Sequence, residues 1–68
     1  MGDILDKIAK NVRFYRLKRG MTQERLAKKA GLSRGYISQI EHAKINLYLS
    51  TLVKLAKRLG VRPKNLVK

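Results

Sequence analysis

Apolar residues near the start of the chain recur at the spacing of one face of an α-helix. They are separated by four, four and three positions, which places them in one stripe along a helix, and they are Ile4, Ile8, Val12 and Tyr15. Polar residues fill most of the positions between them. Glycine readily adopts the left-handed conformation that ends helices, so Gly20 is expected to stop this helix. We therefore predict a first helix over residues 4–18.

Two short helices are predicted next, each from the residue types at its ends. Thr22 and Ser33 carry hydroxyl groups that cap helix N-termini, and Gly31 between them suits the end of the first of these helices. The positions expected to face the core are Leu26, Ala27, Ala30, Ile37 and Ile40. The two helices are therefore separated by a very short turn.

The last third of the chain predicts a loop and two further helices. Residues 44–47 are expected to form the loop, and a fourth helix over residues 48–59 ends at Gly60. Its core positions are Leu52, Leu55, Ala56 and Leu59. Pro63 suits the first turn of a short fifth helix. We predict one all-α domain over residues 1–68, a compact five-helix bundle whose modest core needs good packing or a partner subunit.

The charge of the chain indicates an anionic partner. There are 17 lysines and arginines against four acidic residues, which gives a net charge of +13. Nucleic acid and an acidic membrane surface both fit such an excess, whereas a merely solubilising surface usually mixes both signs. A basic amphipathic helix on a membrane is less consistent with two glycine-punctuated turns. We therefore favour nucleic acid.

Several function classes lack the residues that they need. The chain has no cysteine and one histidine, His42, so disulfides and metal clusters are not expected, and neither is a cofactor or a small-molecule ligand. No pair of acids and no serine–histidine pairing suggests catalysis, so we expect no enzyme. No apolar run approaches the roughly 20 residues of a membrane span, and no signal peptide is apparent. We expect a soluble, cytoplasmic protein.

Residues 22–41 carry the strongest indication of function. Two short helices meet there at a tight turn, where Gly31 can adopt a positive φ at little cost. Ala27 is small enough to let the second helix approach closely. This arrangement holds the later helix, over about residues 33–42, free to enter a DNA major groove about 12 Å wide.

The motifs in and around this segment resemble those of a known family. They are RxxxGMTQ from residue 16, LAxxAGLS from residue 26, YISxIE from residue 36 and LxKLAxxLGV from residue 52. Together they resemble the Cro/phage-repressor (XRE-like) helix-turn-helix proteins. The segment RGYISQIEHAKIN, over residues 34–46, also resembles the controller proteins of restriction–modification systems. The resemblance implies a lambda-repressor-like fold and a sequence-specific regulator of transcription that binds double-stranded DNA.

The resemblance makes the start of the third helix the part that reads bases. Arg34 can hold guanine O6 and N7 bidentately, with a phosphate contact as the alternative. Gln39 suits either adenine or a phosphate. Tyr36 suits a thymine methyl, a phosphate or a deformable base step, and packing against the preceding helix is its alternative. Gly35 has no side chain with which to read and is expected to permit close approach of the backbone.

Phosphate contacts are expected around these base contacts. The resemblance implies that the amide of Gln23 clamps a phosphate at a helix N-terminus. The other candidates lie near the expected groove edges or are weaker ones on the first two helices, and they are Ser33, Ser38, Lys44, Asn46, Arg13 and Lys28. The remaining cations are expected to be solvated and to face away from DNA: Lys54, Lys57, Arg58, Arg62 and Lys64.

Glu41 lies at the end of a helix, where the helix dipole disfavours a negative charge. The resemblance implies a reason, because it places Glu41 opposite Arg16 in a largely buried ion pair between the first and third helices. The family often has glycine at the position of Ala43, and proline then serine at those of Leu47 and Tyr48. The start of the fourth helix is therefore open, with Asn46 as an alternative cap.

Two further sets of apolar residues suggest contacts beyond the core. Phe14 and Leu17 form either a second apolar patch or a surface covered by the C-terminal tail. Ile45, Leu47, Val53, Leu66 and Val67 offer a seam for a homodimer, with ordinary core packing as the alternative. A dimer would present two third helices about 34 Å apart to palindromic DNA. The main rival function is an antitoxin-like or coactivator-like module that uses the same fold to bind a protein.

Overall fold

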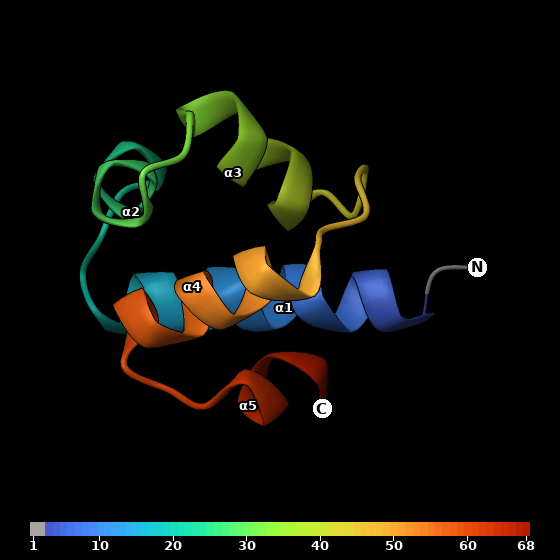
Figure 1. The fold of residues 1–68 in the computed structure, drawn as a ribbon. Helices are drawn as coiled ribbons and strands as arrows, with labels where there is room; N and C mark the ends of the chain where they lie inside the picture. The colour runs from blue at the N-terminus through green and yellow to red at the C-terminus, as the bar shows by residue number, and fades with distance from the viewer. Residues whose placement is uncertain (1–2) are drawn as a thin grey trace.

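Two longer helices form the middle of the molecule, and the shorter helices lie on either side of them. The computed structural model describes residues 3–68. Its helices are α1 (Asp3–Lys18), α2 (Gln23–Ala30), α3 (Arg34–Glu41), α4 (Leu49–Leu59) and α5 (Pro63–Val67). In Figure 1, α3 lies on one side of α1 and α4, and α5 lies on the opposite side. The predicted all-α fold of five helices is confirmed.

Local side-chain chemistry starts the second and third helices where the sequence predicted. The Thr22 hydroxyl oxygen accepts a hydrogen bond from the Arg25 N–H at 3.0 Å, and the Ser33 hydroxyl oxygen accepts one from the Tyr36 N–H at 3.1 Å. Each bond satisfies one backbone donor that the first turn leaves free. The alternative cap at Asn46 is wrong, because α4 begins later and Tyr48 occupies its N-cap position without a side-chain bond.

Four of the helices end in the same hydrogen-bonded turn. In each, a residue with positive φ donates its N–H to a carbonyl near the helix end, and the next N–H bonds to the carbonyl one residue further back, as in the Schellman motif. Glycine occupies the positive-φ position after α1, α2 and α4. After α3 that position is Ala43, with φ of 56°. The turn that follows α3 is therefore strained by a Cβ atom that the other three lack.

Replacing Ala43 by glycine is expected to raise the free energy of unfolding by about 1 kcal/mol. The left-handed conformation costs a residue with a Cβ atom about 1–2 kcal/mol, and the greater freedom of glycine in the unfolded chain offsets part of the gain. The reciprocal change Gly31→Ala adds a Cβ at φ of 68° and should lower stability by a similar amount. Urea unfolding of both variants measures the effect, and shifts of the same sign would contradict this account.

One apolar core joins all five helices. Its fully buried side chains are Val12, Leu26, Ile37, Ile40, Leu55, Leu59 and Leu66. Two expectations need correction. Ile4 is half exposed, because the first turn of α1 extends past the neighbouring helices (Figure 1). Leu66 has no exposed surface, so it belongs to the core and is not available to a dimer seam.

Two polar side chains fasten the C-terminal segment to α1. Asn11 donates its amide N–H to the Leu66 carbonyl oxygen at 2.9 Å. Arg19 donates Nε–H to the Leu59 carbonyl oxygen at 2.8 Å, which satisfies a carbonyl at the end of α4 and places a positive charge at the negative end of that helix. Among residues 3–68, no helix is long and apolar enough to cross a membrane.

Candidate nucleic-acid interface

The unit formed by α2, a tight turn and α3 is held together by backbone and apolar contacts. Gly31 adopts φ of 68°, and the Leu32 N–H bonds to the Ala27 carbonyl oxygen at 2.8 Å. Ala27 and Ile37 are both buried where the two helices pack. The short turn and the small side chain at Ala27 let α3 pack closely across α2.

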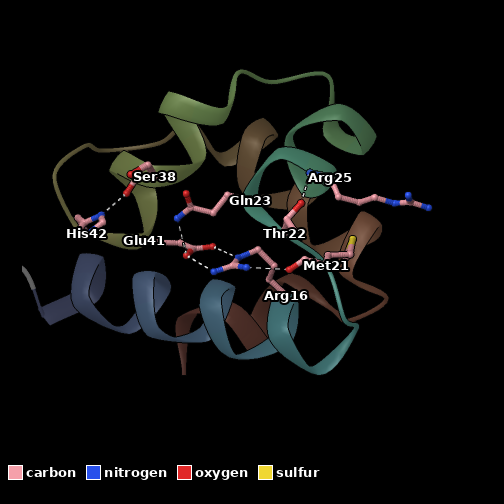
Figure 2. A network of polar contacts seen from close by, with 8 residues as sticks. All are labelled: Arg16, Met21, Thr22, Gln23, Arg25, Ser38, Glu41 and His42. Carbon is pink, nitrogen blue, oxygen red and sulfur yellow. Dashed lines mark hydrogen bonds and ion pairs between the residues drawn. The ribbon is translucent and has the colours of Figure 1, made fainter.

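A charged pair connects this unit to α1. Arg16 donates Nε–H to Glu41 Oε2 at 2.6 Å and Nη2–H to Glu41 Oε1 at 2.9 Å, and Figure 2 shows the paired geometry. The Glu41 side chain is 1% exposed and that of Arg16 is 9% exposed. Such parallel charge-assisted bonds are strong and directional. The pair implied by the resemblance is therefore present, and it joins α1 to the last turn of α3.

Two further bonds complete the network. Arg16 also donates Nη1–H to the Met21 carbonyl oxygen at 2.8 Å, and Gln23 donates its amide N–H to Glu41 Oε1 at 3.1 Å (Figure 2). Glu41 thus receives donors from α1 and from the first residue of α2. Among the described residues, no buried side-chain nitrogen or oxygen lacks a partner. Buried networks that are fully satisfied in this way define one orientation of the elements that they join.

Gln23 lies differently from what the resemblance implied. Its amide is half buried and bonded to Glu41, which the sequence motif alone did not indicate. An amide carries two N–H donors, so the second remains for another acceptor. The phosphate contact of Gln23 stays a prediction, and it requires this second N–H or a turn of the side chain away from Glu41.

The opposite face of α3 carries the side chains that are free to reach a partner. Arg34, Gly35 and Gln39 are exposed, whereas Tyr36 is half buried and packs against the core. A DNA contact by Tyr36 therefore stays a prediction, and so does its alternative of packing against the preceding helix. The three base-contact candidates thus lie on one short helix, α3. The buried network around Glu41 fixes the orientation of this helix from its inner face.

His42, expected from the sequence to be a surface or loop residue without a role in DNA binding, lies beside these side chains. It is exposed at the C-terminal end of α3, and its Nδ1–H donates to the Ser38 carbonyl oxygen at 2.8 Å. It lies three positions after Gln39, a spacing that places the two side chains on the same face of a helix. That spacing is the signal by which the sequence indicates it.

The phosphate candidates surround α3 unevenly. Lys44 and Asn46 are exposed in the loop that follows α3, and Lys28 is exposed on α2. Arg13 instead lines a groove with Phe14 on the outer face of α1. Ser33 uses its hydroxyl oxygen as a cap, which leaves the hydroxyl hydrogen free to donate. The cations expected to be solvated, from Lys54 onward, are all exposed.

Among residues 3–68, no group of three or more histidine, cysteine or acidic side chains is placed to hold a metal ion.

Comparison with known proteins identifies the family. A family model described as "Helix-turn-helix" matches residues 12–66, which is most of the chain. The chain belongs to the helix-turn-helix family. The predicted resemblance is confirmed, and the matched range includes α2, the turn and α3 as well as the core helix α4.

Relatives within the family share the segment at moderate identity. A hypothetical transcription factor of Neisseria meningitidis is 41% identical over 59 residues, which cover 87% of this chain and 56% of that protein. The control protein C.SmaI of Serratia marcescens is 47% identical over 58 residues, which cover 85% of this chain and 69% of that protein. The chain thus spans little more than half of the Neisseria protein.

Solved structures of family members have the same fold. The crystal structure of the restriction-modification controller protein C.AhdI from Aeromonas hydrophila superposes with a TM-score of 0.87 and 35% sequence identity. The superposition covers 91% of this chain and 94% of that chain. The five-helix arrangement is therefore shared over almost the full length of a family member.

Proposed function

We propose that this DNA-binding transcriptional regulator of the helix-turn-helix family binds a palindromic operator as a homodimer and reads it through the major groove. The exposed face of α3 is the observation that carries the proposal. Arg34 and Gln39 project from a short helix whose other face is buried and tied to α1 through Glu41. Sequence-specific DNA binding needs base-contacting side chains on an element of fixed orientation. In α3, exposed side chains of suitable chemistry lie on a helix that the buried network orients.

Each side chain on this face suits a particular contact. Arg34 can grip guanine bidentately, and Gln39 can do the same with adenine. Tyr36 can touch a thymine methyl or a deformable step from the edge of the face. The net charge of +13 supplies the attraction for phosphates that dominates affinity for DNA. A protein that regulates transcription in this way acts beside the genome, so we place it in the cytoplasm.

The dimer seam follows from the apolar side chains that the core leaves uncovered. Leu49 and Val53 lie one turn apart on α4, and they are 73% and 46% exposed. Tyr48, at the N-cap of the same helix, is 81% exposed. We therefore propose a seam formed by these three residues, extended by the half-buried Ile45 and Leu47 in the preceding loop. Val67 is half-buried like Ile45 and Leu47, and all three pack against the core, so each contributes only its exposed part.

Selection of binding sites from random duplex DNA tests the proposal. We expect an enriched palindrome whose affinity falls steeply as the salt concentration rises. Arg34→Ala is then expected to weaken binding to that palindrome by about 10–100-fold and to relax selection at one base pair in each half-site, because a bidentate contact to guanine contributes about 1–3 kcal/mol of discrimination.

Lys64→Ala is the matched control, because it removes one exposed positive charge from α5, on the far side of the molecule from α3. It should leave the selected sequence unchanged. A uniform loss of affinity with Arg34→Ala, without relaxed selection, would show a phosphate contact in place of base reading. Salt-sensitive binding with no enriched sequence would overturn the proposal that the protein recognises a specific DNA sequence.

A further inference from the structure

The outer face of α1 carries a groove with an apolar floor and a cationic rim. Phe14 and Leu17 form the floor and are 56% and 55% exposed. The cations that line the same groove are Lys7, Lys10, Arg13 and Lys68. Of the described residues that line it, none is acidic. Lys68 borders the groove, and the described residues leave both apolar side chains of the floor exposed.

This groove faces away from the DNA-reading side of the molecule. Arg16 points from α1 toward α3, where it pairs with Glu41. Phe14 lies two positions earlier, which is about 200° around the helix, so it projects from the opposite side of α1. A protein bound to DNA through α3 therefore leaves this groove open to a second partner.

Two contacts order the Phe14 ring in the floor of the groove. The Phe14 ring lies edge-on to the Tyr15 ring, with centroids 5.1 Å apart, and the Lys18 ammonium lies 5.6 Å from its centroid. Both arrangements are favourable for an aromatic ring. An anchor that is already ordered loses less conformational freedom when a partner binds.

The charge of the rim selects among the occupants of such a groove. A second copy of the chain would bring the same cations, and a net charge of +13, against this surface. DNA would satisfy the cations but leave the phenyl and isobutyl groups without apolar contact. A protein segment with apolar anchors flanked by carboxylates satisfies both the floor and the rim.

We propose that this groove binds an acidic amphipathic segment of another protein, whose apolar side chains cover Phe14 and Leu17 while its carboxylates pair with the surrounding lysines and arginine. The pattern is the helix-in-groove mode of recognition. The inference does not depend on the operator or on dimerisation. Its consequence is a docking surface that remains available while the chain is bound to DNA.

The test uses a designed peptide and the full chain. The probe is a synthetic helical peptide with leucine and phenylalanine along one face and glutamate on the others. Titration at physiological salt should shift the NMR resonances of Phe14 and Leu17. The double variant F14S/L17S is expected to weaken binding about tenfold or more, because it removes the apolar area that the anchors would cover.

Two controls separate specific docking from general charge attraction. L49S/V53S removes exposed apolar side chains from α4 and should leave peptide affinity unchanged. A peptide of the same composition in scrambled order should bind at least about tenfold more weakly than the amphipathic one. K10E should weaken binding without altering helix content measured by circular dichroism, because Lys10 is an exposed residue of the rim.

Three results would overturn the inference. One is equal affinity for the amphipathic and scrambled peptides, which means attraction by charge alone. Another is equal affinity of the wild type and F14S/L17S. The third is absence of peptide binding together with Phe14-dependent binding to phosphatidylglycerol vesicles, which would assign the groove to an anionic membrane surface. Circular dichroism of F14S/L17S verifies that the variant is folded.

Discussion

Glu41→Ala is expected to lower the free energy of unfolding by about 3–5 kcal/mol, because it strands a buried charge. The Arg16 side chain, 9% exposed in the intact pair, loses both of its bonds to the carboxylate, and Gln23 loses its acceptor as well. Folded domains are stable by about 5–15 kcal/mol in total, so this loss is a large fraction of the whole and should move the unfolding transition to a much lower urea concentration. Urea unfolding monitored by circular dichroism measures the loss.

The control for this prediction is Glu24→Ala, which removes an exposed carboxylate from the first turn of α2. It should cost less than about 1 kcal/mol, the usual contribution of a charge near a helix end. The double variant R16M/E41L should be more stable than Glu41→Ala, because replacing both partners by apolar side chains leaves no uncompensated charge. A loss below about 1 kcal/mol for Glu41→Ala would contradict the account of the network.

L49S/V53S is expected to weaken binding to the selected palindrome by about 100-fold or more. If the protomers associate through α4, the second half-site is bound at a high effective concentration, which increases affinity by about 10²–10⁴-fold over independent binding. The substitutions remove the two α4 residues of the proposed seam, both of which are exposed in one chain, so the fold itself should be retained. Sedimentation and electrophoretic shift assays measure self-association and affinity.

F14S/L17S is the matched control for that experiment, since it removes two exposed apolar side chains from a helix outside the proposed seam. It should leave both self-association and palindrome binding at wild-type levels. Affinity for a single half-site should be similar for all three proteins. A seam variant that still binds the palindrome as tightly as wild type would contradict dimerisation through α4. In a complex with DNA, we expect the two α3 helices to lie about 34 Å apart.

The features that the sequence predicted best depend on neighbouring residues. The caps at Thr22 and Ser33 and the left-handed glycine at Gly31 follow from backbone groups within a few positions, so the residue types are sufficient to indicate them. The stripe that begins at Ile4 shows the limit of periodicity. It indicates which face of a helix is apolar, but not how far the neighbouring helices extend along that face.

Contacts between distant residues were harder to anticipate. The Arg19 bond to the Leu59 carbonyl oxygen spans 40 positions, and that from Asn11 to the Leu66 carbonyl oxygen spans 55. Backbone carbonyls are the acceptors in both, so no pattern of residue types marks the partner. Gln23 shows a related difficulty, because a polar side chain near DNA-binding positions can serve the fold instead. The Arg16–Glu41 ion pair was expected only because of the family resemblance, since the spacing of the two residues in the sequence does not predict it.

The separation of the two faces of α3 has a consequence for how such proteins diversify. The scaffold is maintained by Ile37, Ile40 and Glu41, all of which face inward, whereas Arg34 and Gln39 are exposed. Substitutions at these exposed positions therefore change the stability of the fold little. If Arg34 and Gln39 read bases as proposed, lineages that inherit this domain can acquire new genomic targets through a few codon changes while the rest of the gene stays the same.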